Sequence, residues 1–564
     1  MSPRGALGRA KPWGWAASCF LAMACANEPH DTPREDAGAE VGQDAGDGID
    51  ALDIPWEDAR VDDSSDAEDA QDPEDVQDAQ DSEDTQDSED APDGEEPRTR
   101  ALWWGPRAAP EGARVPLWVQ VQEDGGLARG VSGWLDAPVG GAEGPRVLVR
   151  RGAGSTTWSA PAGSLELAGR PVGRELPRRR LEGSLSGSGL VWGPDEVIEL
   201  PLGAQIPRGS SLTVHEGVWV LLGERANLDV SGSISVEGSQ AAPVVFEALE
   251  LGKPWGGVKH DGDGRWRWAF VLEAGADASR AFGHSRSQPA LYAGPGARLD
   301  LERVAVQDCV GKGVSGREAQ ITMRGCMTAR TDTGGEHEYV ALTLEESHFM
   351  DFPTLDAPPA DDDNDAIYLR GTLMLDGEPA MSRIADTTFI GGQDDGVDHN
   401  SATVELERVW IEGFAHEGVA ASDGGAIWVR DSVVKGCQQG VEAGYGAPAL
   451  VVERSLLWGN GVGARFGDSY QRTYEGSLTV LDTVFFENTD RCLWDFLLST
   501  QAPGPEGAVS VSGSLCEDDT LPADAGNARG SAVLDEGLRL APDSPGRGIG
   551  TGGADPGLQT PTPR

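Results

Sequence analysis

The stretch from Ser211 to Phe246 reads SLTVHEGVWVLLGERANLDVSGSISVEGSQAAPVVF and contains five short runs of closely spaced apolar residues. The runs begin at Leu212, Val218, Leu228, Ile234 and Val244, so successive starts are 6, 10, 6 and 10 residues apart. In all five runs the first apolar residue is followed by another two positions later, which is typical of a β-strand that buries one face. The stretch therefore predicts a series of very short strands.

Similar apolar pairs recur much later in the chain, at Val404/Leu406, Ile427/Val429, Leu450/Val452 and Leu478/Val480. From Leu406 onward the spacing is 23, 23 and 28 residues. A period in the low twenties, with about three short strands per repeat, is typical of a chain that stacks coil upon coil. Leucine-rich repeats share this period but need a helix-forming stretch and an Asn ladder, and these repeats lack both. The sequence therefore predicts an all-β parallel β-helix.

The same residues also carry a family resemblance. The Ser211–Phe246 stretch, followed by Trp255-Gly-Gly-Val258, resembles the entry of right-handed parallel β-helix proteins of the pectin-lyase-like superfamily. The segment LRLAPDSPGRGIGTGG from Leu538 is similar to the closing segment of many of them. The resemblance implies a right-handed coil over roughly residues 190 to 550 in a secreted bacterial protein. It does not imply one activity, because the fold hosts lyases, hydrolases, epimerases and adhesins.

The first 25 residues are typical of an export signal. Arg4, Arg9 and Lys11 precede an apolar run at 13–24 that is too short to span a bilayer as a helix. The run ends in Leu21-Ala-Met-Ala-Cys25, which resembles a bacterial lipoprotein cleavage site, although the pattern prefers leucine one residue later. We therefore expect lipidation at Cys25, with the protein held at the outer membrane or cell surface of a bacterium by this anchor alone. Ordinary secretion with an incidental cysteine is the alternative.

Residues 26–100 carry 29 acidic and four basic side chains. The net charge of this segment is about half of the formal net charge of −49 of the 564-residue chain. Asp recurs at every third position from Asp63 to Asp93, a period that fits neither helix nor strand. Few apolar residues are available for burial, so this segment is predicted to be a disordered, extended tether. A chain this acidic lacks the basic surface that nucleic-acid binding requires, which excludes that class of partner.

Short alternating runs at 117–121, 147–149 and 165–167, separated by Gly and Pro, predict a small β-sandwich-like domain over residues 101–185. The β-helix would then occupy residues 186–550, followed by a tail at 551–564. Cys492 and Cys516 lie 24 residues apart, about one coil, and are the best candidates for a disulfide.

Glycines recur at positions 396, 418, 440 and 463, so they are expected to occupy one corner of successive coils with a positive φ angle. Their neighbours would then form vertical columns. The expected columns are Asp365, Asp395, Glu417, Gln439; Asn364, Asp394, His416, Gln438; and Asp398, Ala420, Glu442, Arg465. Stacked coils are ~4.8 Å apart, a separation at which paired carboxylates repel each other.

Three arrangements could relieve this repulsion: a bound cation, a shared proton, or the nearby cations Arg370, Arg465 and protonated His416. Calcium suits an oxygen-rich site, with Asp365, Asp395 and Glu417 as the expected ligands. Alternatively, carboxyls of raised pKa beside histidines would supply an acid and a base for glycan chemistry. The candidate catalytic residues are Asp395, Asp398, His399, His416 and Glu417, and the candidate binding residues are Asp394, Glu442, Tyr445, Arg465 and Asp468.

Asp-Gly columns also arise in any solenoid, because these residues suit tight corners. The segments around these corners are richer in His, acidic and aromatic residues than turns require. We therefore expect a monomer that binds extracellular polysaccharide or another cell-surface ligand through an acidic groove. The alternative is a polysaccharide lyase, hydrolase or epimerase on the same scaffold.

Overall fold

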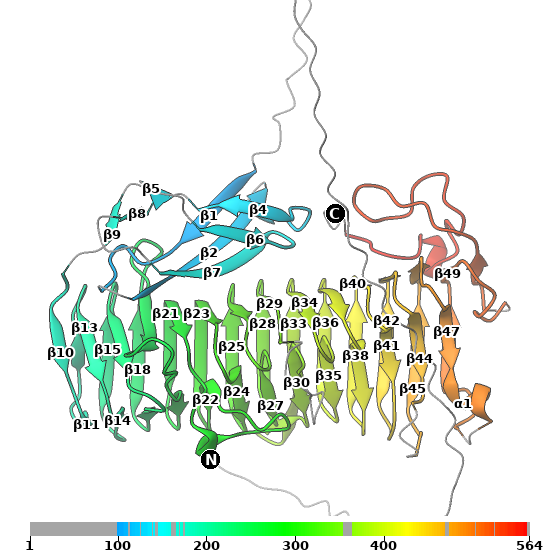
Figure 1. Ribbon diagram of the computed structural model, residues 1–564. Coiled ribbons are helices and arrows are strands. Elements are labelled where there is room, and N and C mark those ends of the chain that lie inside the picture. Colours follow the sequence, from blue (N-terminus) through cyan, green and yellow to red (C-terminus); the bar gives the residue numbers. More distant parts are fainter. Residues whose placement is uncertain are drawn as a thin grey trace, which may run out of the picture. The chain divides into compact units, whose positions relative to one another are not determined.

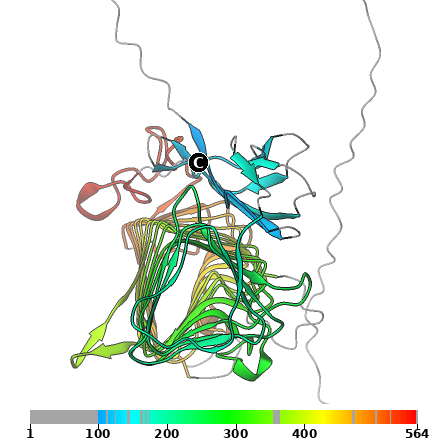
Figure 2. The ribbon, with the colours of Figure 1, turned by 90° about the vertical axis from the view of Figure 1, so that its left-hand side faces the viewer.

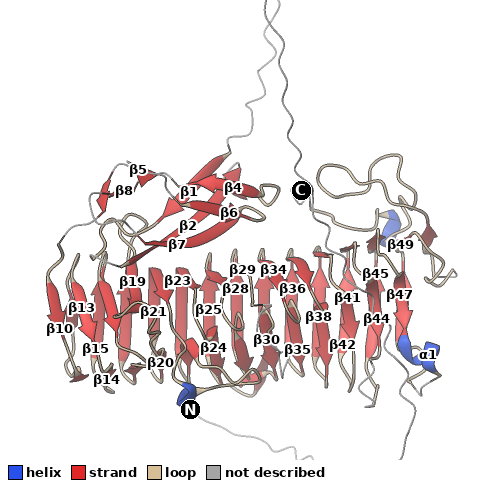
Figure 3. Ribbon diagram, in the orientation of Figure 1, coloured by secondary structure: helices blue, strands red, loops and turns tan. Residues whose placement is uncertain are grey.

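The computed structural model describes residues 99–110, 113–123, 126–137, 139–140, 145–159, 165–167, 170–172, 175–353, 364–468, 473–501, 504–523 and 525–560. The predicted export signal, the predicted lipidation at Cys25 and residues 26–98 of the predicted tether lie outside these residues. The last two residues of the predicted tether are described, and Arg100 begins a strand. Among the described residues, no helix combines the length and apolar character needed to cross a membrane. Strands dominate, and the helical elements described are α1 (Phe496–Thr500) and two short 3-10 turns, η1 (Ala278–Arg280) and η2 (Thr551–Gly553) (Figure 3).

The fold prediction is confirmed: the chain forms a parallel β-helix in which each coil contributes a strand to each of three faces (Figures 1 and 2). Faces 1 and 2 together form a 26-stranded sheet, and face 3 is a separate 13-stranded sheet. Face 1 consists of β12 (Leu190–Trp192), β15 (Ser211–His215), β18 (Ser233–Glu237), the first parts of β21 (Gly264–Leu272) and β23 (Arg298–Gln307), β25 (Gln320–Arg324), β28 (Ala341–Glu345), β33 (Ser382–Ala385), β36 (Thr403–Glu407), β39 (Ala426–Arg430), β42 (Ala449–Glu453), β45 (Ser477–Leu481) and β48 (Val509–Ser512).

Face 2 follows face 1 in each coil. It consists of β10 (Arg178–Arg180), β13 (Val197–Leu200), β16 (Trp219–Leu222), β19 (Val244–Ala248), the second parts of β21 and β23, β26 (Met327–Ala329), β29 (His348–Met350), β34 (Thr388–Gly392), β37 (Trp410–Phe414), β40 (Val433–Lys435), β43 (Leu456–Trp458), β46 (Val484–Phe486), β49 (Leu515–Cys516) and β50 (Ala528–Arg529).

Face 3 closes each coil and carries the candidate site. It consists of β11 (Gly183–Ser184), β14 (Ala204–Ile206), β17 (Leu228–Val230), β20 (Val258–His260), β22 (Pro289–Ala293), β24 (Lys312–Arg317), β27 (Glu336–Glu338), β30 (Ile367–Arg370), β35 (Val397–Asn400), β38 (Glu417–Ser422), β41 (Gln439–Ala443), β44 (Val462–Phe466) and β47 (Arg491–Asp495). A hairpin of β31 (Leu373–Leu375) and β32 (Glu378–Ala380) follows β30.

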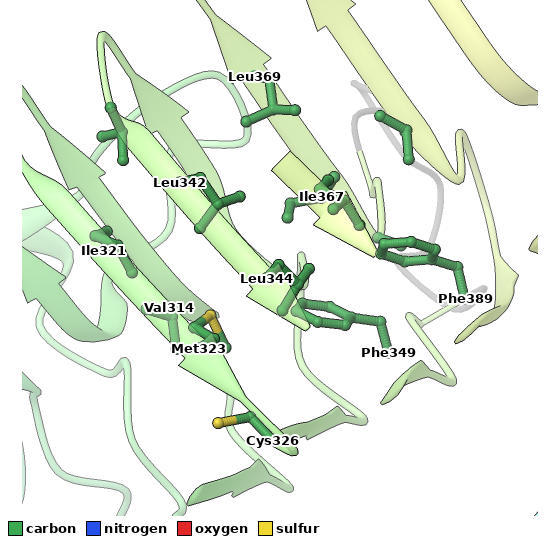
Figure 4. Close-up of a cluster of buried hydrophobic side chains, with 14 of the residues drawn as sticks. Val314, Ile321, Met323, Cys326, Leu342, Leu344, Phe349, Ile367, Leu369 and Phe389 are labelled. Atoms are coloured by element: carbon green, nitrogen blue, oxygen red, sulfur yellow. The ribbon is translucent and has the colours of Figure 1, made fainter. Parts of the chain in front are cut away.

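The strand register places the repeated apolar residues directly on one another. Leu406 pairs with Val429, Val429 with Val452, and Val452 with Val480, which are the residues whose spacing predicted the coil. Because side chains alternate along a strand, these residues all point inward. They belong to one continuous core that runs the length of the coil. Figure 4 shows a section of this core, in which Phe349 and Phe389 pack with their ring centres 5.3 Å apart.

The N-terminal domain has a main antiparallel sheet and two smaller ones. The main sheet is β1 (Arg100–Trp104), β2 (Arg114–Glu123), β3 (Gly126–Leu127) and β7 (Ala153–Ser159); the others are β4 (Gly133–Asp136) with β6 (Arg146–Val149), and β5 (Val139–Gly140) with β8 (Leu165–Leu167) and β9 (Arg170–Val172). The three runs predicted as strands lie in β2, β6 and β8. Val119 on β2 packs with Val147 on β6 in a small core of the domain's own.

The outer side of face 2 is apolar and covered. Trp118 and Leu117 of the N-terminal domain pack on it over the earlier coils, and Trp219 donates a hydrogen bond from Nε1 to the Ala108 carbonyl oxygen at 2.8 Å. Over the later coils, Leu538 and Leu558 of the C-terminal segment pack there. Figure 1 shows both covering segments above the coil. Faces 1 and 3 are therefore the ones left for polar side chains.

Cys492 and Cys516 form a disulfide that joins β47 of face 3 to β49, the pair that their spacing predicts. Cys309, Cys326 and Cys437 are free and buried. Burial raises the pKa of each of these three thiols, so they are inert core residues rather than nucleophiles.

Candidate functional site

The predicted columns exist on the outer side of face 3. Glu417 pairs with Gln439, which pairs with Val462, and the neighbouring pairs Ile367–Val397 and Val397–Val419 place Asp365 and Asp395 in the same column. Hydrogen bonds also link successive members of this column, each from a backbone N–H to the carboxylate one coil earlier. Asp395 N donates to Asp365 Oδ1 at 3.2 Å, and Glu417 N donates to Asp395 Oδ1 at 2.8 Å.

The explanation predicted for the repeated glycines is wrong, because Gly396, Gly418, Gly440 and Gly463 do not have positive φ angles. They are required instead by close packing between coils. A Cβ on Gly418 would lie 2.2 Å from Val434 Cγ1, and one on Gly440 would lie 2.5 Å from the Gly463 carbonyl oxygen. Only glycine lets the backbone of these coils approach so closely.

The acidic side chains next to these glycines form a compact cluster. Oxygens of Asp365, Asp395 and Asp398 all lie within 4.8 Å of one another, and the same holds for Asp394, Asp395 and the His416 nitrogen. Asp365 is 2% exposed and Asp395 is 5% exposed. The first trio could supply oxygen ligands to a hard divalent cation such as calcium. This set of possible cation ligands contains Asp398 where the predicted set contains Glu417, because the Glu417 side chain is directed to His416.

His416 lies among three carboxyls. Its Nδ1 is 2.8 Å from Glu417 Oε2, 3.1 Å from Asp394 Oδ1 and 3.7 Å from Asp395 Oδ1. Hydrogen bonds to Asp394 and Glu417 raise the pKa of His416 to about 10, against the opposing effect of its partial burial. At neutral pH His416 is therefore a cation that neutralises the cluster, not a free base.

The pKa values of the two adjacent carboxyls are displaced in opposite directions. Burial, reinforced by Glu417, raises the pKa of Asp395 well above its ordinary value. Burial alone would also raise the pKa of Glu417. The hydrogen bond and charge of His416, together with the hydrogen bond of Asp395 and the charge of Arg465, outweigh burial and lower this pKa. Asp395 and Glu417 are hydrogen-bonded to each other. The opposite directions of these shifts favour the proton on Asp395 and the charge on Glu417, so both a shared proton and the cation His416 act against the repulsion in this column.

The network continues into the next two coils. Gln439, oriented so that both polar atoms of its amide are satisfied, donates to Glu417 Oε1 at 3.2 Å and accepts from Arg465 Nη1 at 2.6 Å. Arg465 Nε lies 3.0 Å from Glu442 Oε2. Burial raises the pKa of Glu442, and the nearby Glu417 adds to this shift. The guanidinium of Arg465 also lies 5.4 Å from the centre of the Trp494 ring.

His399 does not belong to the site, so the prediction that it is catalytic is wrong. It lies on β35 one residue after Asp398 and therefore points to the opposite side of the sheet, into the core. It is 0% exposed, its strand neighbours are Leu369 and Ala421, and its Nε2 lies 2.6 Å from the Ala402 carbonyl oxygen. Burial lowers the pKa of His399 and keeps it neutral.

The remaining predicted binding residues lie at the margin of the cluster. Asp468 is 2% exposed and accepts a 2.6 Å hydrogen bond at Oδ1 from the Tyr474 hydroxyl. A Cβ on Gly444 would contact both Asp468 Oδ2 and Glu442 Oε1, which places these two carboxyls side by side. Tyr445 accepts a hydrogen bond at its hydroxyl from Asn400 Nδ2 at 3.5 Å.

Sequence reasoning missed the upstream part of the same face. Tyr368 pairs with Asp398 in the strand register, and its ring stacks on that of His284 at 5.7 Å. One coil earlier, Lys312 Nζ binds Glu336 Oε1 at 2.5 Å. Gly313 and Gly334 are 21 residues apart, which is close to the spacing of the later glycines. The insertion before residue 366 interrupts this spacing, so the earlier pair is not recognised as part of the same series.

We expect the ring of His416 to remain protonated at pH 8 in an NMR titration, because its carboxylate partners stabilise the imidazolium. A group whose folded-state pKa is raised contributes its full stability below its unfolded pKa, about 6.5, and loses that contribution as pH rises through about 10. The free energy of unfolding should therefore fall over this range, and the His416→Gln variant should show less of this fall. In the same spectra His399 should remain neutral. Titration of His416 near pH 6.5 would contradict the assignment.

No protein-family model and no curated protein matches this chain. Among solved structures, one that is similar is the catalytic unit of a thermostable GH87 α-1,3-glucanase from Streptomyces thermodiastaticus strain HF3-3. It shares 12% sequence identity with a TM-score of 0.30, and the match covers 78% of this chain and 95% of that chain.

Proposed function

We propose that the outer side of face 3, around the carboxylate cluster, binds a neutral polysaccharide outside the cell. The observation that carries this proposal is the buried chain of side-chain contacts Asp395–Glu417–Gln439–Arg465–Glu442, which crosses four coils and ends against Trp494. Buried, mutually coupled carboxyls are costly, and clusters with strongly displaced pKa values are concentrated at functional sites.

Face 1 provides the contrast that makes this cluster unusual. Its outward positions carry exposed Arg–Glu pairs from neighbouring coils, such as Arg324–Glu345 at 2.9 Å and Arg383–Glu407 at 2.7 Å. These are ordinary solvated ladders on the surface of a stable coil. The same coils on face 3 instead place side chains that are more than nine-tenths buried, which a solenoid does not need for stacking.

The chemistry of the cluster favours a neutral sugar chain. Hydroxyl groups both donate and accept hydrogen bonds, so they suit a network of carboxyls, an amide and a guanidinium. The indole of Trp494 and the ring of Phe496, 5.3 Å from the Arg465 guanidinium, add amphipathic surfaces at the end of the network. The cluster contains seven carboxyls but two cations, His416 and Arg465, and this excess of acidic groups disfavours an anionic polymer. The seven carboxyls are those of Asp365, Asp394, Asp395, Asp398, Glu417, Glu442 and Asp468.

The test is retention of the full chain on a panel of immobilised neutral gluco-, manno- and galacto-oligosaccharides. We expect the Asp398→Ala and Trp494→Ala variants each to weaken retention about tenfold, which corresponds to the loss of one good polar or stacking contact. The matched controls are Asp300→Ala on face 1 and Trp134→Ala on β4, both at exposed side chains. Equal retention of wild type and both site variants would contradict the proposal.

Hydrolysis of the bound glycan is the second candidate. The raised pKa of Asp395 beside Asp394 and Asp398 is the observation that favours it, because a neutral carboxyl can protonate a glycosidic oxygen. Glu417 is hydrogen-bonded to Asp395 and so lies too close to it to activate a water across a sugar ring, which leaves Asp395 as the residue whose replacement tests this candidate. Release of reducing ends from the retained oligosaccharides, abolished in Asp395→Asn, would support hydrolysis. Retention without product would leave binding as the function.

The location that suits this function is the cell exterior. We propose that the export signal is removed, that Cys25 is lipidated and that the acidic residues 26–100 hold the coil away from the membrane.

A further inference from the structure

A second concave region lies on face 3, several coils before the carboxylate cluster. It is a cleft of about 880 Å³ that is floored by outward side chains of β14, β17, β20 and β22. Its floor includes the register column Gln205, Asp229, Lys259 and Tyr292. The volume is in the range of clefts that hold a bound small molecule or a short oligosaccharide.

One wall of the cleft is the segment that connects face 2 to β22, and it is held in place by buried polar contacts. Gln288, 4% exposed, donates from Nε2 to Asn227 Oδ1 at 2.7 Å and accepts at Oε1 from Asp277 N at 2.7 Å. Phe282 N donates to the Ser287 carbonyl oxygen at 3.0 Å. The Phe282 ring packs edge-on against Tyr292, with ring centres 5.0 Å apart. The wall is therefore formed before any ligand binds.

Four of the five charged groups that line the cleft form two ion pairs. Arg280 binds Asp229 in a bidentate pair, and Lys259 Nζ lies 3.0 Å from Asp261 Oδ2. Arg208 also lines the cleft, so three cations face two carboxylates. The cleft is thus nearly balanced in charge, unlike the carboxylate cluster. Fixed donors and acceptors of both signs, two amides and two aromatic rings suit the hydroxyls and apolar faces of a neutral sugar.

The cleft and the carboxylate cluster are separate sites on one face. Tyr292 lies four register steps from Asp398, which is ~19 Å at ~4.8 Å per coil. The segment after Phe282 lies between them: His284 N and Ser285 N donate to Glu336 at 2.7 and 3.0 Å, and the His284 ring stacks on Tyr368. A ligand in the cleft therefore does not contact the cluster.

We propose that this cleft is a second binding site for a neutral oligosaccharide, with Tyr292 as its stacking surface and Lys259, Asp229 and Gln205 as its polar contacts. The inference rests on the proposed function for the class of ligand, but it assigns a different place on the coil. Two sites on one rigid face would bind a long chain more tightly than either site alone, because the second contact is made at high effective concentration.

The test is calorimetric titration of the full chain with the neutral oligosaccharide of two to four units that gives the strongest signal on the immobilised panel. We expect two molecules bound per wild-type chain, and one per chain for both Tyr292→Ala and Asp398→Ala. Tyr339→Ala and Lys253→Ala are the matched controls for Tyr292→Ala and Lys259→Ala, since both lie at exposed positions outside the cleft. Lys259→Ala should weaken cleft binding about tenfold, and added NaCl should not weaken it in the wild type.

The outcomes separate this inference from the proposed function. One molecule per chain whose binding survives Tyr292→Ala but is lost in Asp398→Ala would overturn the cleft and leave the cluster as the site. One molecule lost in Tyr292→Ala but retained in Asp398→Ala would support the cleft and overturn the proposed function. A cleft that binds only sulfated or uronate-containing oligosaccharides, or a chain that binds none of the panel, would overturn the cleft proposal.

Discussion

Replacing Phe389 with alanine is expected to lower the free energy of unfolding by about 3–5 kcal/mol. Phe389 lies on β34, is 0% exposed and stands between Phe349 and Ile411 of the neighbouring coils. Figure 4 shows Phe389 among the buried side chains of the core, and removing its ring leaves a cavity that the surrounding structure can fill only in part. The measurement is the midpoint of denaturant unfolding, followed by circular dichroism.

The matched control for Phe389→Ala is Met374→Ala on the projecting hairpin, where the side chain is 56% exposed. That change removes apolar atoms that are largely in water already, and it should alter stability by less than about 0.5 kcal/mol. If Phe389→Ala were as mild as Met374→Ala, the interior of the coil would not be packed as described, and the superposition of the coils would be in doubt.

The coil itself could be predicted because its signal is repeated. Each inward residue packs on the equivalent residue one coil away, as Leu406 does on Val429. The spacing of such residues along the chain therefore equals the length of a coil. The same constraint placed Asp395 and Glu417 in one column. A periodic sequence therefore specified both the core and the acidic column with no knowledge of the loops between strands.

The errors have a common physical origin, because sequence spacing gives position along a coil but not the direction or surroundings of a side chain. The closeness of His399 to Asp398 in sequence predicts a site residue, but alternation along a strand sends adjacent side chains to opposite sides. The recurrence of Gly418 predicts a turn conformation, but contacts with the next coil are what require a glycine at this position. The sequence does not predict the pairing of Glu336 with Lys312. An insertion separates these two residues from the later coils and breaks the regular spacing that would align them.

Replacing Lys312 with methionine is expected to destabilise the protein by about 3–5 kcal/mol, although methionine fills a similar volume. The Lys312 and Glu336 side chains are 0% and 1% exposed, so removing the ammonium leaves a buried carboxylate without its counter-charge. The backbone donors at His284 and Ser285 remain, but they cannot neutralise a full charge. The readout is again the denaturant midpoint of the full chain.

The control for Lys312→Met is Arg324→Met, which breaks the exposed pair Arg324–Glu345. The Arg324 side chain is 53% exposed, so this change should cost less than about 1 kcal/mol.

The double variant Lys312→Met with Glu336→Leu removes both buried charges and should recover much of the lost stability. It also removes the acceptor that holds residues 284 and 285, so oligosaccharide binding in the cleft should weaken while the fold is retained. A double variant less stable than Lys312→Met alone would mean that Glu336 acts chiefly as a backbone acceptor, and that its hydrogen bonds to the 284–285 segment outweigh its pairing with Lys312.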